Sequence, residues 1–156
     1  MMEISVPLPN EAATKKLGAA LARRLKTGDV VALSGPLGAG KTTLARSAIA
    51  ELTGRNEAPS PTFSLVEVYE TAAFPLFHFD LYRLEKADDV WELGLEDALD
   101  GVCLIEWPER IAGLLPPETL LVRLSGSSGS VDAGARRALI RGDDIWAPRL
   151  AGLNPA

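Results

Sequence analysis

The hydrophobic positions of this chain repeat with two different periods, and glycine or proline marks most places where the period changes. From Asn10 to about Lys26, apolar residues recur every three or four positions, which predicts an amphipathic helix with Asn10 as its N-cap. A second such pattern predicts a helix over residues 43–52 that Gly54 closes. The short apolar run 29–33 between them is typical of a buried strand. Residues 10–52 are therefore expected to form a helix, a strand and a second helix.

Further runs along the chain alternate or stay apolar over the length of a strand. They cover residues 3–8, 65–69, 76–80, 102–105, 119–124 and 137–141. About four residues, 71–74, separate the pairing ends of the second and third runs, so we expect an antiparallel hairpin there. The run 102–105 is too apolar for anything but a central strand, and we expect the proline-containing run 3–8 at an edge.

Short helices are predicted in the second half of the chain, over 87–100 and over 108–115. We find neither an internal repeat nor a composition shift that would mark a domain boundary. We therefore expect a single domain over residues 1–141. Residues 142–156 are expected to form a loose C-terminal tail that Trp146 holds down.

Composition narrows the class of protein. The 156 residues are 47% hydrophobic and 24% charged, as in an ordinary globular protein. The net charge of −5 argues against binding nucleic acid by phosphate attraction alone, which needs a basic face. The single cysteine, Cys103, lies in an apolar run, so we expect a buried small side chain rather than a reactive thiol. No run approaches the roughly 18–20 apolar residues of a membrane span, and we expect a cytoplasmic protein without membrane contact.

A glycine-rich segment, GPLGAGKT, lies between the predicted buried strand and the second predicted helix. It fits the pattern G-x-x-x-x-G-K-[ST] of a phosphate-binding loop. At a strand-to-helix turn, backbone N–H groups and the helix N-terminus can surround a polyphosphate, Lys41 can reach the β- and γ-phosphates, and Thr42 can bind Mg²⁺. The alternative is a glycine-rich turn that matches the pattern by accident. The predicted strand before the segment and the predicted helix after it argue against an accidental match. The expected nucleotide-binding residues are Gly35, Pro36, Leu37, Gly38, Ala39, Gly40, Lys41, Thr42 and Thr43.

The phosphate loop and the order of the elements together indicate the fold class. We expect an α/β fold of the P-loop NTPase type with three layers. Its central sheet should be mixed, mostly parallel with one antiparallel hairpin.

Two acidic residues end predicted strands, where a phosphate-loop protein needs carboxylates near its metal. Asp80 fits the Walker B position, although an aspartate there can also cap a turn. Glu106 ends the central strand, but a charged residue that ends a strand is common. Because ligands of open α/β sheets bind beyond the carboxyl ends of strands, Thr42, Asp80 and Glu106 could converge on one Mg²⁺. We expect His78, the single histidine, to be a hydrogen-bonded core residue rather than a catalytic base.

Thr62 follows two prolines, Pro59 and Pro61, which restrict the backbone on either side of residue 60. A rigid approach of this kind could present the Thr62 hydroxyl to the γ-phosphate or its metal, as switch loops of P-loop NTPases do. The alternative is a proline-rich turn that leads into the next strand.

Four segments, in this order and spacing, resemble the TsaE family of small bacterial P-loop ATPases, which act in threonylcarbamoyladenosine biosynthesis on tRNA. They are GPLGAGKTT at 35–43, SPTF at 60–63, HFDLYR at 78–83 and IEWPE at 105–109. The resemblance covers roughly residues 3–141. It implies a P-loop fold, ATP and Mg²⁺ as ligands, and docking on a complex of two sugar-kinase-fold proteins, TsaB and TsaD. In such a system, TsaD transfers the threonylcarbamoyl group to the tRNA adenosine, and ATP hydrolysis by the TsaE-like subunit lets the cycle repeat.

The resemblance also implies roles for individual residues. Lys41 would bind phosphate, Thr42 and Glu106 would ligate Mg²⁺, and Asp80 would complete the metal shell or orient water. Thr62 would belong to a switch-like loop.

Two further residues receive weaker assignments from the resemblance. Asn10, at the start of the first helix, would approach the adenine. Trp107 would face a partner, sense the nucleotide, or simply belong to the core. Because the chain is acidic and has no obvious basic stripe, protein partners are favoured over direct contact with tRNA.

Three alternatives remain open from the sequence. A small phosphotransferase would need an arginine-bearing lid over its acceptor, and no arginine-rich insertion appears between the later strands. A nucleotide-gated interaction module would hydrolyse too slowly for turnover to matter. A GTPase would carry the guanine-reading Asn-Lys-x-Asp, which is absent; the nearest match, EKAD at 85–88, follows the wrong element.

Overall fold

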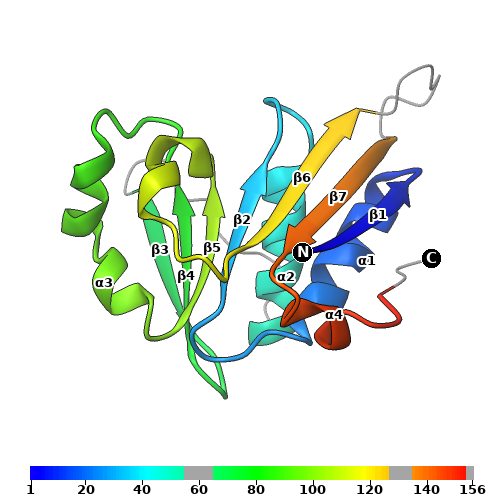
Figure 1. Cartoon of the computed structure of the whole chain (residues 1–156), viewed down its shortest axis with the longest axis horizontal. Helices are drawn as coiled ribbons and strands as arrows, with labels where there is room; N and C mark the ends of the chain where they lie inside the picture. The colour runs from blue at the N-terminus through cyan, green and yellow to red at the C-terminus, as the bar shows by residue number, and fades with distance from the viewer. Residues whose placement is uncertain (55–64, 127–134, 154–156) are drawn as a thin grey trace.

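The computed structural model describes residues 1–54, 65–126 and 135–153 of the chain. Within these residues, seven strands form one sheet in the order β1-β7-β6-β2-β5-β4-β3 (Figure 1). The strands are β1 (Met2–Leu8), β2 (Val30–Ser34), β3 (Val66–Glu70), β4 (Pro75–Asp80), β5 (Val102–Glu106), β6 (Leu120–Gly126) and β7 (Arg136–Gly142). Each predicted strand is therefore present, and β1 lies at an edge as expected.

Helices cover both faces of the sheet. They are α1 (Glu11–Ala22), α2 (Lys41–Thr53), the 3₁₀ helix η1 (Ala87–Leu93), α3 (Leu95–Ala98), the 3₁₀ helix η2 (Pro108–Leu114) and α4 (Trp146–Arg149). The side chains of α1 and α2 join the apolar cluster on one face, and those of η1, α3 and η2 join the cluster on the other (Figure 1). β5 is buried along its whole length because both of its faces are covered. The predicted three-layer α/β fold is confirmed.

The sheet is mixed, as predicted. β2 pairs in parallel with β5 and β6, and β4 pairs in parallel with β5. The predicted β3–β4 hairpin is confirmed, because Glu70 pairs with Pro75 and residues 71–74 connect the two strands. β6 with β7 and β1 with β7 are also antiparallel, so the sheet holds three antiparallel pairs where the sequence predicts one. Because a parallel pair needs a long crossover, usually a helix, the short β6–β7 connection imposes the antiparallel arrangement.

The first helix ends four residues earlier than the sequence predicts. α1 stops at Ala22, and the chain then turns to enter β2. Gly28 has a φ of 96°, and the Asp29 carboxylate accepts a hydrogen bond from the Lys26 backbone N–H. Leu25 nevertheless stays buried, so the apolar stripe of the sequence extends beyond the end of the helix. Periodicity alone therefore overestimates the length of α1.

The described part of the C-terminal tail is packed, whereas the sequence predicts a loose tail. Trp146 is buried as expected, and its indole N–H donates to the carbonyl of Glu118 at 2.8 Å. Arg149, also on α4, forms an ion pair with Asp29 and donates to the carbonyl of Arg24 at 2.8 Å. The Arg149 contacts tie α4 to both ends of the turn between α1 and β2, and the Trp146 contact ties it to the segment before β6. In the described ranges, no helix has the length and apolar character needed to span a membrane.

Candidate nucleotide-binding site

The glycine-rich loop connects β2 to α2 and passes close to β6. Gly35 has a φ of 141°, and a Cβ atom there would lie 2.3 Å from the carbonyl oxygen of Leu124. Gly40 has a φ of 100° and precedes the first turn of α2. Other residues rarely adopt such φ values, so glycine is needed at both positions.

The N-terminus of α2 is suited to an anion. Its N-cap, Gly40, supplies no side-chain hydrogen bond, and its first turn carries no acidic residue. The first N–H groups of a helix have no partner within the helix, and the helix dipole adds partial positive charge at this end. A phosphate group is the typical ligand of such a turn.

Lys41 is almost completely buried and folds back over the loop. Its ammonium donates a hydrogen bond to the carbonyl of Gly35 and lies 3.3 Å from the centre of the Trp107 ring. Burial lowers the pKa of Lys41, and the nearby carboxylates of Glu106 and Glu109 act in the opposite direction. The structure thus keeps the cation beside the loop, and no carboxylate of the described residues forms an ion pair with it.

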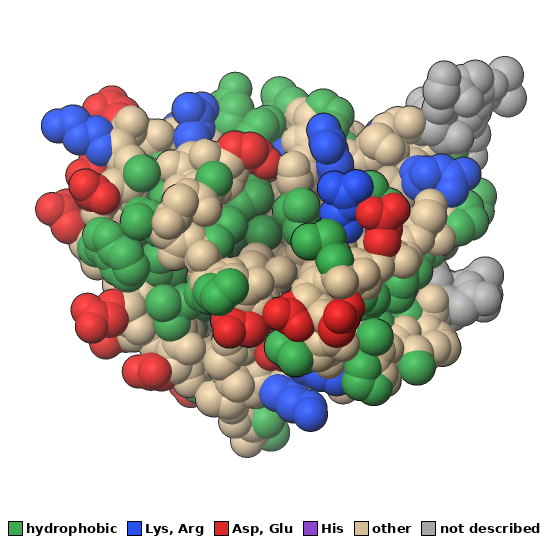
Figure 2. Space-filling view, in the orientation of Figure 1, with side chains coloured by type: hydrophobic (Ala, Val, Ile, Leu, Met, Phe, Trp, Pro, Cys, Tyr) green, Lys and Arg blue, Asp and Glu red, His purple; other side chains and the backbone are tan. Residues whose placement is uncertain are grey.

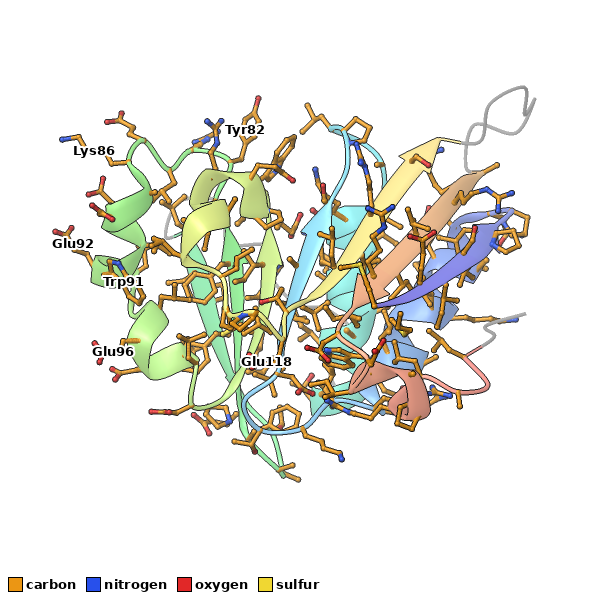
Figure 3. All side chains as sticks on the ribbon, in the orientation of Figure 1. Tyr82, Lys86, Trp91, Glu92, Glu96 and Glu118 are labelled. Atoms are coloured by element: carbon orange, nitrogen blue, oxygen red, sulfur yellow. The ribbon has the colours of Figure 1, made fainter. Side chains whose placement is uncertain are left out.

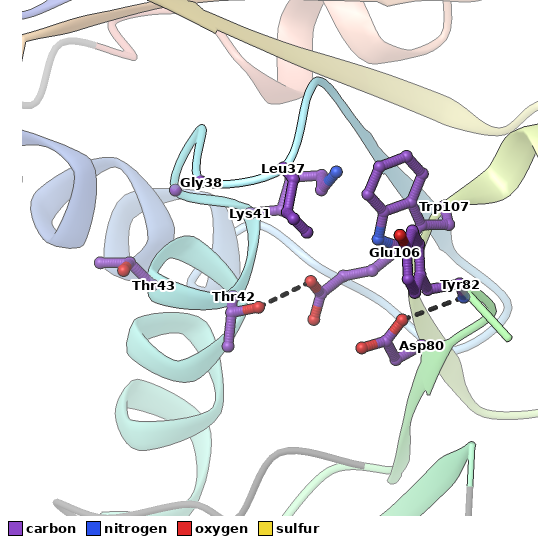
Figure 4. Close-up of a pocket in the computed structure, with 10 residues that line it drawn as sticks. Leu37, Gly38, Lys41, Thr42, Thr43, Asp80, Tyr82, Glu106 and Trp107 are labelled. Atoms are coloured by element: carbon purple, nitrogen blue, oxygen red, sulfur yellow. Dashed lines mark hydrogen bonds between the residues drawn. The ribbon is translucent and has the colours of Figure 1, made fainter. Parts of the chain in front are cut away.

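Glu106, the last residue of β5, receives two hydrogen bonds. The Thr42 hydroxyl donates to its Oε1 at 2.8 Å (Figure 4). Nε2 of His78 lies 2.6 Å from its Oε2. β4 and β5 are paired so that Asp80 lies opposite Glu106, which brings both carboxylates to the same edge of the sheet. The structure therefore brings Thr42, Asp80 and Glu106 together.

Asp80 lies across the cavity from Thr42 (Figure 4). Its Oδ1 accepts a hydrogen bond from the backbone N–H of Tyr82 at 3.1 Å. Burial raises the pKa of Asp80, the Tyr82 hydrogen bond opposes this shift, and the Glu106 carboxylate adds to it. The cavity measures about 270 Å³. It is lined by Leu37, Gly38, Gly40, Lys41, Thr42, Thr43, Asp80, Tyr82, Glu106 and Trp107.

The residues at this edge fit a Mg²⁺ ion that binds together with a phosphate. Thr42, Asp80 and Glu106 offer hard oxygen donors, which Mg²⁺ prefers. Among the described residues, no group of three or more His, Cys, Asp or Glu side chains could hold a metal by itself. Mg²⁺ commonly uses one or two carboxylates with substrate phosphates and water, so the donor set suits a metal–nucleotide complex.

Comparisons with known proteins agree with this geometry. The sequence model of the family described as "Threonylcarbamoyl adenosine biosynthesis protein TsaE" matches residues 8–137. The chain belongs to the TsaE family. The resemblance found in the sequence is thereby confirmed.

Individual relatives support the family assignment. A protein from Rickettsia felis named "tRNA threonylcarbamoyladenosine biosynthesis protein TsaE" is 48% identical over 119 residues, or 75% of this chain and 70% of the relative. A protein of the same name from Bacillus subtilis is 39% identical over 115 residues, or 72% of each. The crystal structure of Bacillus subtilis YdiB matches with a TM-score of 0.77 and 28% identity, covering 97% of this chain and 94% of that one. The fold of that protein therefore extends over nearly the whole chain.

Trp107 forms part of the cavity wall in this TsaE chain. Its backbone is left-handed, with a φ of 60°, which is uncommon for a bulky residue. Its ring packs on Tyr82 with centroids 4.9 Å apart and covers the Lys41 ammonium. Just beyond it, Glu109 accepts a hydrogen bond from the Ser34 hydroxyl at 2.8 Å, which ties η2 to the end of β2. Of the three roles that the sequence left open for Trp107, this position is compatible with nucleotide sensing.

Arg136 is a site residue that the sequence analysis missed. It begins β7, and its guanidinium donates to the carbonyl of Gly38 at 2.9 Å. Together with Glu11, Thr14 and the loop, it lines a small recess of about 150 Å³ beside Thr43. Neither spacing nor a motif marked this arginine, because β7 reaches the loop only through its pairing with β6.

The structure tests some of the remaining residue predictions and leaves others untested. His78 is buried and hydrogen-bonded, which confirms the expected core histidine. Asn10 is confirmed as an N-cap, since its Oδ1 accepts from the Ala13 N–H at 2.9 Å. Its contact with adenine stays a prediction. Thr62 and its neighbours, 60–63, lie outside the described residues, so its switch role also stays a prediction.

Proposed function

We propose that this chain is a Mg²⁺-dependent ATPase that supports a TsaB–TsaD-like complex in the threonylcarbamoyladenosine modification of tRNA. The observation that carries the proposal is the contact between the Thr42 hydroxyl and Oε1 of Glu106 at 2.8 Å. It joins the phosphate-binding loop to a buried carboxylate at the end of the central strand. This is the pairing that metal-dependent P-loop NTPases need beside the phosphates.

The chain's own residues divide the work as follows. The loop N–H groups and the N-terminus of α2 bind the phosphates, and Lys41 leaves the Gly35 carbonyl to contact them. Thr42 and Glu106 would hold Mg²⁺, and Asp80 would complete the metal shell or orient the attacking water. When bound, Mg²⁺ supplies positive charge that neutralises the phosphate oxygens.

Trp107 and Tyr82 line one side of the cavity. Thr62 is assigned to the switch-like loop, and Asn10 to the neighbourhood of the adenine.

The partner assignment has separate support. Relatives that share 39–48% identity are named as threonylcarbamoyladenosine biosynthesis proteins. On the face shown in Figure 2, Lys and Arg side chains are scattered and form no single stripe. The net charge of −5 likewise disfavours direct binding of a polyanion. We therefore propose that TsaB-like and TsaD-like proteins are the direct partners and that tRNA is reached through the complex.

The proposal predicts that Lys41→Ala loses nucleotide binding while the fold stays intact. ATP with Mg²⁺ at about 100 times its Kd should stabilise the unaltered protein by about 2.7 kcal/mol, and the variant should show no such gain in a thermal-shift measurement. Hydrolysis should fall on the order of 100-fold or more, since a group that stabilises the reacting phosphate is lost. Lys86→Ala is the matched control, because Lys86 is exposed near η1, far from the cavity (Figure 3).

Three outcomes would change the assignment. An unchanged hydrolysis rate in Lys41→Ala would contradict the nucleotide site. A larger stabilisation by GTP than by ATP would indicate a GTPase. Tight ATP binding without measurable turnover, alone or with partners, would favour a nucleotide-gated interaction module.

A further inference from the structure

His78 is a completely buried polar residue directly behind the proposed metal site. Its side chain is 0% exposed and that of Glu106 is 2% exposed. Nε2 of His78 and Oε2 of Glu106 are 2.6 Å apart, which is a short hydrogen bond. The two residues lie on adjacent parallel strands, β4 and β5. The contact is therefore built into the centre of the sheet.

The strand register explains why the imidazole reaches this carboxylate. Asp80 pairs with Glu106, and His78 pairs with Leu104, one step deeper in the sheet. Because side chains alternate between the two faces of a strand, His78 and Asp80 lie on the same face as Glu106. His78 thus lies behind Glu106, and Asp80 lies beside it at the edge of the cavity.

The two oxygens of Glu106 have separate partners. Oε2 is held by His78, and Oε1 accepts the hydrogen bond of the Thr42 hydroxyl. A carboxylate fixed at one oxygen has little freedom to rotate. The imidazole therefore determines which way Oε1 points.

Packing alone does not account for a histidine at this position. Its second nitrogen, Nδ1, is buried and has no hydrogen-bond partner among the described residues. A buried polar atom without a partner destabilises the folded state, and an apolar side chain would avoid this cost. The bond to Glu106 is the compensating contact that the structure shows.

We propose that His78 is a positioning residue that holds Oε2 of Glu106, so that Oε1 faces Thr42 and the divalent cation of the metal–nucleotide complex. The inference rests on the proposed function and adds a specific role to it. His78 itself touches neither nucleotide nor metal. Its effect should appear in the Mg²⁺ requirement, because groups behind a metal ligand typically change metal affinity on the order of 10–100-fold.

A matched pair of variants separates this role from simple packing. The amide N–H of Gln can reach Oε2 from nearly the position of the imidazole Nε2, whereas the amide of Asn is one carbon too short. Each purified variant is titrated with Mg²⁺ in the presence of a fluorescent ATP analogue, and analogue affinity is also measured in EDTA. Mg²⁺ should enhance binding of the analogue. We expect His78→Asn to raise the Mg²⁺ concentration that gives half of this enhancement, on the order of 10–100-fold. His78→Gln should stay near the unaltered protein, and neither variant should change affinity in EDTA.

A second measurement uses the unaltered protein and does not depend on the variants folding. His78 is the single histidine, so the imidazole ¹⁵N signals of the labelled protein belong to it alone. We expect the Nε2 signal to shift when Mg²⁺ is added to the nucleotide-bound protein.

The outcomes distinguish the positioning role of His78 from the proposed ATPase function. Three results would overturn the positioning role and leave the ATPase proposal standing. They are an unchanged Mg²⁺ requirement in His78→Asn, an equal change of that requirement in both variants, and an Nε2 signal that does not move when Mg²⁺ is added. Absence of ATP binding in the unaltered protein would overturn both.

Discussion

Glu106 is the residue on which the site converges, although it stands 64 positions from Thr42 in the sequence. The sequence marked Thr42, Asp80 and Glu106 as oxygen donors at strand or helix ends, and their proximity followed from the expected parallel pairing. The partners of Glu106 within the sheet depend on register, which periodicity does not supply. For this reason, its bond to His78 emerged only from the structure.

At the same scale, Asp80 should lower the stability of the nucleotide-free protein. Burial raises the pKa of Asp80 above its ordinary value of 3.8, so the folded protein keeps this proton to higher pH than the unfolded chain. The stability of the folded protein therefore falls as the pH rises above that value and this half-buried carboxyl ionises. We expect Asp80→Asn to unfold at a higher temperature at pH 7 and to hydrolyse ATP more slowly.

Calorimetry from about pH 4 to about pH 7 tests this prediction, because the advantage of the variant should grow with pH. Asp88→Asn, at an exposed position on η1, is the control and should change neither property. A lower unfolding temperature for Asp80→Asn at neutral pH would contradict the sign of the effect.

Some residue-level features were beyond sequence reasoning for physical reasons. Trp107 covers Lys41 because its backbone turns into the left-handed region, and the rings of Trp107 and Tyr82 pack together. No local pattern encodes that conformation in a tryptophan. Arg136 reaches Gly38, 98 positions away in the sequence, because β7 pairs with β6 and β6 pairs with β2.

At the scale of elements, the phosphate loop depends on the packing of α1 against α2. Gly18 of α1 faces α2, where a Cβ would lie 1.8 Å from the Ser47 Oγ and 2.5 Å from the Leu44 carbonyl oxygen. α2 begins at Lys41, so its position sets the position of the loop. Helix existence, the hairpin and the central strands were predictable, because each follows from a local period or from short loops. The end of α1 was not, because the turn at Gly28 and Asp29 lies inside the apolar period, and the β1–β7 pair was not, because its strands are remote in sequence.

We expect Gly18→Ala to destabilise the protein by about 1–3 kcal/mol, the usual cost of overpacking. In a chain of this length, that lowers the melting temperature by about 2–4 °C for each kcal/mol. Gly113→Ala is the control, since no described residue other than its chain neighbours lies within 4 Å of a Cβ there. It should stay within about 0.5 kcal/mol of the unaltered protein. Equal stability of the two variants would show that α1 and α2 can separate without cost.

At the scale of the whole molecule, the two ends of the sheet have different roles. The carboxyl ends of β4 and β5 meet the loop, and the opposite end is closed by α4 through Trp146 and the Asp29–Arg149 ion pair. Figure 3 shows Trp91, Glu92 and Glu96 along η1 and α3, away from the cavity. The overall class and three-layer fold were predictable from composition, element order and the phosphate loop. The packing of the tail was not, because a short segment with one tryptophan carries little periodic signal.

The most direct test of the account is Mg²⁺-dependent ATP hydrolysis by the purified chain, measured alone and with the TsaB–TsaD pair from the same source. We predict a slow rate alone that rises when the pair is added and that disappears in Lys41→Ala. A rate that the pair leaves unchanged would contradict the proposed partnership, although the nucleotide site would stand. No Mg²⁺-dependent hydrolysis under either condition would contradict the ATPase itself.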